Sequence, residues 1–274
     1  METKQTKGLN RNIIDKYYTS DAAVKLCLKY VKENLKINKD TDLIIEPSAG
    51  NGSFIAGIKS LSNNFIFYDL EPENEEIIKQ DYLSLLSPPQ DPNIHIIGNP
   101  PFGRQSSLAI KFIKKSCEFC NSISFILPKS FKKDSLKKSF KNNFHLIFEI
   151  DLPNTSFLVD NTPHDVPCVF QIWEKKSYNR EIPKQLKPNN FIFVENTDNP
   201  DISFRRVGVN AGTIDTIIDG KSIQSHYFIK FTNNKSINSN LKKLSTITYD
   251  FNNTVGPKSI SKQELIGKFN PSLF

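Results

Sequence analysis

The stretch Leu43-Ile44-Ile45-Glu46-Pro47-Ser48-Ala49-Gly50-Asn51-Gly52-Ser53-Phe54 decides the fold. Its apolar, β-branched start and small-residue continuation are typical of a buried strand that turns tightly into a helix. Gly50 and Gly52 let the backbone turn and approach a ligand, and the following helix would offer free N–H groups. Many Rossmann-like domains contain such a turn, so the stretch alone also fits a purely structural role.

Outward from this stretch, apolar runs of strand length alternate with segments of helical period over the first two-thirds of the chain. This alternation predicts an α/β fold, in which a doubly wound parallel sheet carries helices on both faces. The expected helices cover 21–35 and 107–119, and the further expected strands cover 65–68, 94–97, 123–127, 144–150 and 166–173.

The pattern changes after Trp173, where residues 174–190 are charged and interrupted by prolines. Short strand-like runs separated by Asn, Gly and Asp turns follow, and residues 233–243 are interpreted as a solvated loop. We therefore expect a main domain over 1–175 and a smaller β-rich appendage over 176–274. The strands expected in the appendage cover 191–194, 202–209, 214–218 and 226–231.

Composition narrows the class of protein further. The 274 residues are 38% hydrophobic and carry a net charge of +7, mostly from lysine, which favours a polyanionic partner. Neither an apolar run of about 18 residues nor an export signal is visible, so we expect a soluble, intracellular and cytoplasmic protein. Cys117 and Cys120 have metal-ligand spacing, but no second ligand pair follows them, and no metal site is predicted.

A second motif, Asn99-Pro100-Pro101-Phe102, directly follows the expected strand 94–97 and Gly98. The two prolines fix the backbone and hold the Pro100 carbonyl in a set direction. The Asn99 side chain adds a second carbonyl, so two acceptors can converge on one amino group, and Phe102 offers a flat apolar face. These groups suit a planar ring that bears an exocyclic NH2 group. Taken alone, the motif would be an ordinary proline turn.

The two motifs together, in this order and about fifty residues apart, resemble the class I S-adenosylmethionine-dependent methyltransferases. They are most similar to the amino-methyltransferases with an Asn-Pro-Pro-aromatic motif, which include adenine-N6 DNA methyltransferases. The resemblance covers roughly residues 13–175 and implies a Rossmann-like seven-stranded sheet, with target recognition in the C-terminal region. It also implies S-adenosyl-L-methionine as cofactor, held by the glycine loop. The catalytic residues it implies are Asn99, Pro100, Pro101 and Phe102.

Further cofactor contacts follow from the same resemblance. An acidic residue at the end of the second strand would bind the ribose, and Asp69 stands there, with Glu71 as the second choice. Asp81 would accept from the adenine amino group, with Tyr82 or its neighbours against the ring. The segment 15–19 looks like the amino-terminal cofactor motif, although its tyrosines also suit a hydrophobic staple. The full predicted set is Tyr18, Thr19, Glu46, Pro47, Ser48, Ala49, Gly50, Asn51, Gly52, Phe54, Asp69, Asp81, Tyr82 and Asn99.

Basic and polar residues near the second motif are candidates for substrate contacts. Residues 129–141 contain six lysines and one acid, directly after an expected strand, so they would lie at the ligand-binding edge of the sheet. Such a run is equally compatible with a solvated helix face or with phosphate contact. Arg205 and Arg206 are weaker candidates. The predicted substrate-binding residues are Arg104, Gln105, Ser106, Lys129, Lys132 and Lys133.

We interpret the sequence first as an adenine-N6 methyltransferase that acts on DNA. RNA is the nearest alternative, because the same motif would serve adenine in either polymer and the appendage is small for a DNA-reading domain. A protein glutamine-N5 methyltransferase is less favoured, given the positive charge and Phe102 where that family typically has Tyr. A non-enzymatic nucleic-acid-binding subunit is opposed by the intact glycine loop with Asp69 and Asp81.

Overall fold

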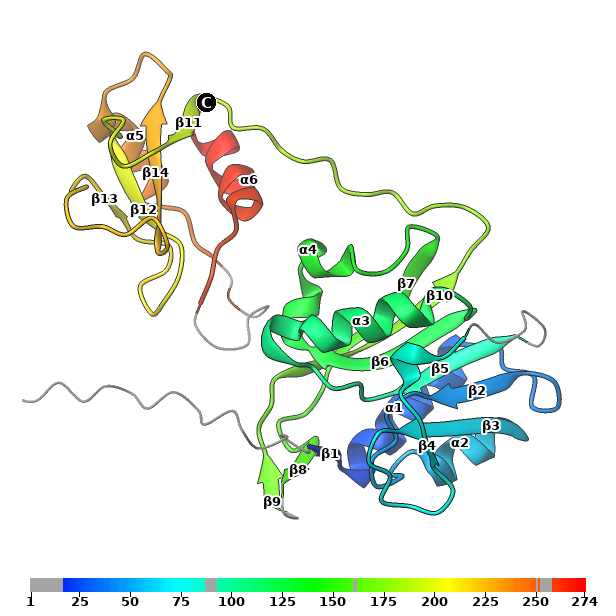
Figure 1. Ribbon diagram of the computed structural model, residues 1–274. Helices are drawn as coiled ribbons and strands as arrows, with labels where there is room; N and C mark the ends of the chain where they lie inside the picture. Colours follow the sequence, from blue (N-terminus) through cyan, green and yellow to red (C-terminus); the bar gives the residue numbers. More distant parts are fainter. Residues whose placement is uncertain (1–16, 87–92, 160–161, 250, 252–257) are drawn as a thin grey trace, which may run out of the picture. The chain divides into compact units, whose positions relative to one another are not determined.

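The computed structural model describes residues 17–86, 93–159, 162–249, 251 and 258–274. The chain divides into two compact units, shown in Figure 1. The first unit comprises Met1–Phe131 with Ser135–Arg180, and the second comprises Lys132–Asp134 with Glu181–Phe274. Each unit has a hydrophobic core of its own, so each is described separately.

A seven-stranded sheet forms the centre of the first unit, in the order β4-β3-β2-β5-β6-β10-β7. The neighbours from β4 to β6 are parallel, whereas β10 is antiparallel to both β6 and β7. The predicted Rossmann-like doubly wound α/β fold is confirmed by this sheet. The strands are β2 (Leu43–Glu46), β3 (Asn64–Asp69), β4 (Ile78–Lys79), β5 (Ile94–Gly98), β6 (Ser122–Pro128), β7 (Phe144–Asp151) and β10 (Cys168–Lys175).

Helices cover both faces of this sheet (Figure 1). Neighbouring residues of one strand enter different cores: Ile44 packs in the core that contains α1 and α2, and Ile45 packs in the core that contains α3. Burial on both faces explains why the strands are continuous apolar runs. The helices of this unit are α1 (Asp21–Asn34), α2 (Ile55–Leu61), α3 (Ser107–Ser116) and α4 (Asp134–Lys137), with short 3₁₀ turns η1 (Tyr82–Ser84), η2 (Arg104–Ser106) and η3 (Lys129–Lys132).

The strand order reverses between β2 and β5. From β2 the chain runs outward to β3 and β4, then returns to form β5 on the other side of β2. In open α/β sheets, ligands bind at the carboxyl ends of the strands beside such a switch point. The glycine loop leaves β2 and the Asn99 motif leaves β5, so the topology brings the two sequence motifs to one place.

A small three-stranded sheet lies outside the central one and has the order β1-β8-β9. β1 (Tyr18–Thr19) pairs antiparallel with β8 (Phe157–Val159), and β8 pairs with β9 (Thr162–His164). The pairing with β8 holds Tyr18 and Thr19, the last two residues of the predicted amino-terminal motif, in position. The first residues of that motif, Asp15 and Lys16, lie outside the described residues.

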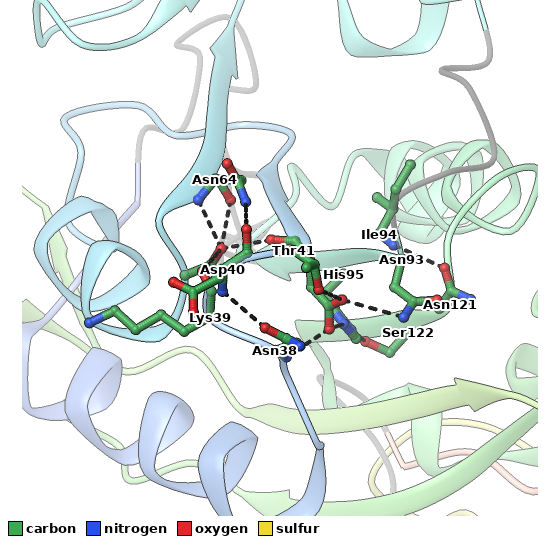
Figure 2. Close-up of polar contacts among 12 residues, drawn as sticks. Asn38, Lys39, Asp40, Thr41, Asn64, Asn93, Ile94, His95, Asn121 and Ser122 are labelled. Atoms are coloured by element: carbon green, nitrogen blue, oxygen red, sulfur yellow. Dashed lines mark hydrogen bonds and ion pairs between the residues drawn. The ribbon is translucent and has the colours of Figure 1, made fainter.

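Side chains at the amino ends of β2, β5 and β6, opposite the carboxyl edge of the sheet, form a polar network, shown in Figure 2. The His95 ring contacts Ser122 Oγ through Nδ1 at 2.7 Å and Asp42 Oδ2 through Nε2 at 3.2 Å. The order serine, histidine, carboxylate is that of a hydrolase triad, but Ser122 is fully buried, at 0% exposure. Because a nucleophile has to reach its substrate, we assign this network to stability.

The second unit contains an antiparallel sheet in the order β11-β14-β12-β13. The predicted β-rich character is confirmed, but the loop predicted for 233–243 is wrong, because most of it forms α5 with Ser236 as the N-cap. The predicted strands 202–209 and 214–218 are also shorter. The elements are β11 (Phe191–Val194), β12 (Ile202–Arg205), β13 (Ile214–Asp215), β14 (His226–Phe231), α5 (Ile237–Leu244) and α6 (Lys262–Ser272).

The described residues lack two kinds of feature. They contain no helix that is long and apolar enough to cross a membrane. They also contain no group of three or more His, Cys, Asp or Glu side chains positioned to hold a metal ion. All four cysteines are buried as free thiols, Cys117 and Cys120 included.

Candidate functional site

Asn99 directly follows β5 at the switch point of the sheet. Two hydrogen bonds orient it, and one of its oxygens has no partner in the described part of the chain. Its amide Nδ2 donates to Thr19 Oγ1 at 3.3 Å, and its backbone carbonyl accepts from Ser48 Oγ at 3.2 Å. Its carbonyl Oδ1 is buried and has no hydrogen-bond partner among the described residues. A buried acceptor without a partner costs about 1–3 kcal/mol, so the remaining direction of Oδ1 is suited to a ligand donor.

The glycine loop after β2 is bonded to the carboxyl end of β3. Gly50 adopts φ +54°, which favours glycine, and its N–H donates to Asp69 Oδ2 at 2.8 Å. A Cβ added at Gly50 would meet only Tyr18 Cε1, at 3.9 Å, so this side of the loop is open. The Gly50 carbonyl accepts from the Glu73 N–H at 3.0 Å, which closes the loop against the segment after β3.

Glu46, the last residue of β2, is the buried carboxyl of the site and is 2% exposed. Burial, reinforced by the negative charge of Asp69, raises the pKa of Glu46 well above its ordinary value. Its Oε2 has no hydrogen-bond partner in the part of the chain that the structure describes. Gly98 permits this packing, because a Cβ there would stand 3.2 Å from Glu46 Cγ and 3.5 Å from Pro47 Cδ.

The amino-terminal motif joins the same site from the opposite end of the sequence. Thr19 is buried and contacts Asn99, while the Tyr18 hydroxyl donates to both carboxylate oxygens of Glu73 at 2.8 Å. Sequence reasoning does not single out Glu73 or Gly98. The acidic run after β3 indicates that a carboxylate lies near the loop. It does not indicate that Glu73 is the one that contacts Tyr18, because the two residues are 55 positions apart.

The other residues of the predicted cofactor set lie in the cores and turns of the first unit. Phe54 and Tyr82 are each 1% exposed and belong to the two cores. The Tyr82 hydroxyl lies 2.8 Å from Ser116 Oγ, and its ring stacks on Phe112, so this ring is packed inside the protein. Asp81 is exposed and accepts from the Leu83 N–H at 2.9 Å as the N-cap of η1. Pro47 and Ala49 are buried, and Ser48, Asn51 and Gly52 line the turn.

The loop after Asn99 combines one aromatic anchor with a strained backbone. Pro100 is buried, Pro101 is exposed, and the partly buried Phe102 packs against both cores of the first unit. The Phe102 carbonyl accepts from the first N–H groups of α3, those of Leu108 and Ala109.

The next three residues complete this loop. Gln105 and Ser106 adopt φ +53° and +62°, a left-handed backbone that is rare outside glycine and frequent at functional sites. The side chains of Arg104 and Gln105 are exposed, whereas Ser106 is buried.

The lysine run does not form one row of free charges. Lys129 pairs with Asp151 at 3.1 Å, and Lys137 pairs with Glu149 at 3.2 Å. Lys132 and Lys133 group with the second unit. Both acidic partners lie on β7, a strand that sequence reasoning did not connect with this run.

Comparisons with known proteins leave the family open. No protein-family profile matches the chain, and no curated protein matches it. Among solved structures, it resembles a proposed RNA methyltransferase, PH1948 from Pyrococcus horikoshii, with 14% identity and a TM-score of 0.46 over 59% of this chain and 87% of that one. It also resembles the N-methyltransferase NodS from Bradyrhizobium japonicum bound to S-adenosyl-L-homocysteine, with 7% identity and a TM-score of 0.42 over 59% and 90%.

A third similar structure is an rRNA methylase from Streptococcus thermophilus, with 15% identity and a TM-score of 0.37 over 56% of this chain and 96% of that one. Scores and identities of this size do not assign an activity.

Proposed function

We propose that this protein is an S-adenosyl-L-methionine-dependent methyltransferase that methylates the exocyclic N6 amino group of adenine in nucleic acid, with DNA favoured over RNA. The observation that carries the proposal is the buried, unpartnered Oδ1 of Asn99, which no hydrogen bond occupies within the described part of the chain. An amino group that approaches this oxygen would supply the missing donor. The same strand end carries Pro100 and Phe102, which adds a second carbonyl and an aromatic ring.

The residues at the switch point fit the proposed cofactor. The open turn at Gly50, the unpartnered Oε2 of Glu46 and the carboxylate of Asp69 would hold it. Each Asp69 oxygen accepts one backbone N–H, from Gly50 and from Glu71, and a carboxylate has capacity for more. When bound, the cofactor supplies a methyl group that its sulfonium charge already activates.

The chain's own contribution is orientation and selective stabilisation of the amine. The lone pair of an aromatic amine is delocalised into its ring, and acceptors at Asn99 and Pro100 favour the pyramidal form in which the lone pair is localised. This form develops as the reaction begins, so the acceptors stabilise the transition state more than the ground state. Thr19 and Ser48 hold Asn99 in position for this role. Phe102 provides a stacking surface, which offsets the cost of removing the base from a duplex.

The proposal is tested by supplying the full-length protein and labelled cofactor with DNA, RNA and protein pools, followed by mass spectrometry of the products. We expect N6-methyladenosine in its deoxyribose form. The ribose form would move the substrate to RNA. Label on the side-chain amide of glutamine would replace the nucleic-acid proposal with a protein methyltransferase, and the absence of label in all three pools would contradict an enzymatic role.

The first testable prediction concerns Asn99→Ala. We expect methyl transfer to fall by about 10²- to 10³-fold, the usual cost of losing one preorganised group that stabilises a transition state. Calorimetry should find cofactor affinity within a few-fold of wild type. Asn142→Ala removes the same amide from an exposed position in a turn and serves as the matched control. Loss of cofactor binding in Asn99→Ala, or methyl transfer close to that of wild type, would contradict the role assigned to Asn99.

A further inference from the structure

The second unit contains a cavity of about 400 Å³, and none of the residues proposed for methyl transfer lines it. Its volume lies within the range of roughly 300–1,000 Å³ that is usual for small-ligand sites. The side chains that line it include three basic residues, Arg205, Lys221 and His226, and three hydroxyl residues, Thr213, Ser222 and Ser225. No acidic side chain is among the described residues that line it.

Strand register explains why basic groups converge there. Arg205 on β12 and His226 on β14 are directly opposite each other in an antiparallel pair, so their side chains project from the same face of the sheet. Phe204 and Tyr227 form the next pair and project from the other face, where they contact the core beneath α5 and α6. One face of the sheet therefore builds the core, and the end of the other face opens into the cavity.

The charges of the cavity are only partly balanced within the protein. Lys221 Nζ pairs with Asp215 Oδ2 at 2.5 Å, whereas Arg205 uses Nε for the Val207 carbonyl at 2.9 Å. No described residue forms a hydrogen bond with the terminal nitrogens of the Arg205 guanidinium. Burial lowers the pKa of His226, and the positive charges of Arg205 and Lys221 lower it further against the opposing effects of Ser222 and Asp215.

The hydrogen bonds of His226 leave one ring nitrogen available. Nδ1 lies 3.0 Å from Ser225 Oγ and 3.3 Å from the Ser222 carbonyl. Within the described residues, Nε2 has no hydrogen-bond partner. Gly220, at φ +72°, has nothing within 4 Å of an added Cβ, so the rim of the cavity is open at this point.

We propose that this cavity binds a phosphate group of the nucleic acid substrate. A phosphate group has several acceptor oxygens and a negative charge, which match the guanidinium, ammonium and hydroxyl groups around the cavity. An apolar ligand would leave these groups without partners. The inference rests on the proposed function for its choice of partner, whereas the affinity for phosphate depends on the cavity alone.

The first experiment titrates inorganic phosphate into the full-length protein and follows backbone amides by NMR. We expect saturable shifts at Gly220, Ser222 and Ser225, with affinity at least five-fold weaker in Arg205→Gln and in Lys221→Gln. Lys230→Gln removes the same charge from an exposed position on β14 outside the cavity, and it should bind phosphate like wild type. Should Arg205→Gln fail to fold, Lys221→Gln decides. The absence of a saturable shift at these amides in wild type would overturn the proposal.

The second experiment measures the affinity of single-stranded oligonucleotides as a function of salt, with and without a 5′-phosphate. Loss of one phosphate contact should reduce the slope of log K against log salt by about 0.7 in Lys221→Gln. Lys230→Gln should keep the wild-type slope. If the effect requires the 5′-phosphate, the cavity binds a strand end, and if it does not, the cavity binds an internal phosphodiester.

The two proposals fail in different ways. An unchanged salt slope in Lys221→Gln, together with normal adenine methylation, would overturn the phosphate site alone. Saturable phosphate binding without methylation of any nucleic acid would contradict the proposed function and leave the cavity as an anion site.

Discussion

Glu46 is a buried carboxyl at the centre of the site, and its protonation links the site to stability. Its raised pKa means that the folded protein retains a proton that the unfolded chain releases near pH 4.5. Stability therefore falls as pH rises from about 4.5 towards the pKa in the fold. Burying a carboxyl group costs free energy of folding, and the hydrophobic core does not require one at this position. Its presence therefore favours a functional role for Glu46.

This linkage gives a prediction for Glu46→Gln, which keeps the shape of the side chain and stays neutral. We expect the variant to unfold at a higher temperature than wild type at pH 8, with the difference shrinking as pH approaches 4.5. Thermal unfolding of the cofactor-free protein at several pH values measures this. Glu33→Gln on α1, where the carboxyl is exposed, is the control for simple charge removal. A difference that does not change with pH would show that Glu46 is ionised in the fold.

Phe102 supports a second prediction at the scale of one residue. Stacking of a base on an aromatic side chain contributes about 1–3 kcal/mol, so Phe102→Ala should raise KM for nucleic acid about 10- to 100-fold. Phe102→Tyr retains the ring and should stay near wild type. Because Phe102 also packs against two cores, the melting temperature of Phe102→Ala should fall as well. An unchanged KM in a folded Phe102→Ala protein would contradict the stacking role.

The sequence predicted the identity of several site residues but not what orients them. Asn99, Glu46, Asp69 and the glycine loop follow strands, and the carboxyl ends of parallel strands meet at one edge, so their proximity was predictable. The contact of Asn99 with Thr19 joins residues 80 positions apart. It depends on β1 pairing with β8, for which no local pattern exists. The burial of Tyr82 was likewise decided by packing against Phe112.

At the scale of elements, six strands of the central sheet were predicted to within two residues, because each is a short apolar run between polar turns. The two-residue strand β4 and the small sheet β1-β8-β9 were not predicted. α5 was missed, since Asn, Ser and Lys dominate its sequence and its intrinsic helix preference is weak. The Ser236 cap and the burial of Leu244 in the core of the second unit stabilise α5 instead. Tertiary packing, which a sequence does not display, made this element helical.

The network between the amino ends of β2, β5 and β6 gives a prediction about pH (Figure 2). Burial lowers the pKa of His95 below its ordinary value, against the opposing bond from Asp42. The neutral ring donates to Asp42 and accepts from Ser122, and the unfolded chain binds a proton near pH 6.5 that the fold excludes. Its contribution to stability is therefore complete above about pH 6.5 and declines as pH falls towards the lowered pKa.

We expect His95→Gln to be less stable than wild type at pH 8 and to lose part of the decline below pH 6.5. One proton contributes at most about 1.4 kcal/mol per pH unit, and urea unfolding at pH 5, 6, 7 and 8 resolves this slope. His164→Gln, which removes an exposed imidazole, is the control variant. If His95→Gln keeps the full wild-type slope, the proton uptake belongs to another group, of which His226 is the first candidate because burial lowers its pKa too.

At the scale of the whole molecule, the first unit extends beyond its last strand. Sequence character changes at Trp173, but the compact unit continues to Arg180. The Arg180 guanidinium donates to the carbonyls of Lys137, Phe140, Lys141 and Phe144, and it lies 5.3 Å from the Trp173 ring centroid. Two of these carbonyls, those of Lys137 and Lys141, also accept the backbone N–H groups of Phe140 and Phe144. The planar guanidinium adds donors to all four in a geometry that lysine lacks. No local sequence pattern predicts this anchor, because its partners lie 36 to 43 positions away.

The anchor leads to a prediction about fragments of the chain. A fragment that ends at Arg180 should fold and bind S-adenosyl-L-methionine with nearly the affinity of the full chain, because the residues proposed for cofactor binding lie in the first unit. It should bind nucleic acid more weakly than the full chain, since the cavity proposed to bind a phosphate group lies in the second unit. A fragment that ends at Lys175 lacks Arg180 and should be less stable by about 1–3 kcal/mol, because it loses the hydrogen bonds that the charged guanidinium donates.

Calorimetry and urea unfolding compare the two fragments, and Arg180→Lys in the longer one separates the effect of the guanidinium from that of chain length. Arg180→Lys should approach the stability of the shorter fragment while cofactor affinity stays close to that of the longer one. Equal stability of all three proteins would show that the Arg180 guanidinium does not stabilise the first unit. Full nucleic-acid affinity in the Arg180 fragment would instead assign substrate binding to the first unit, and the second unit would then have another role.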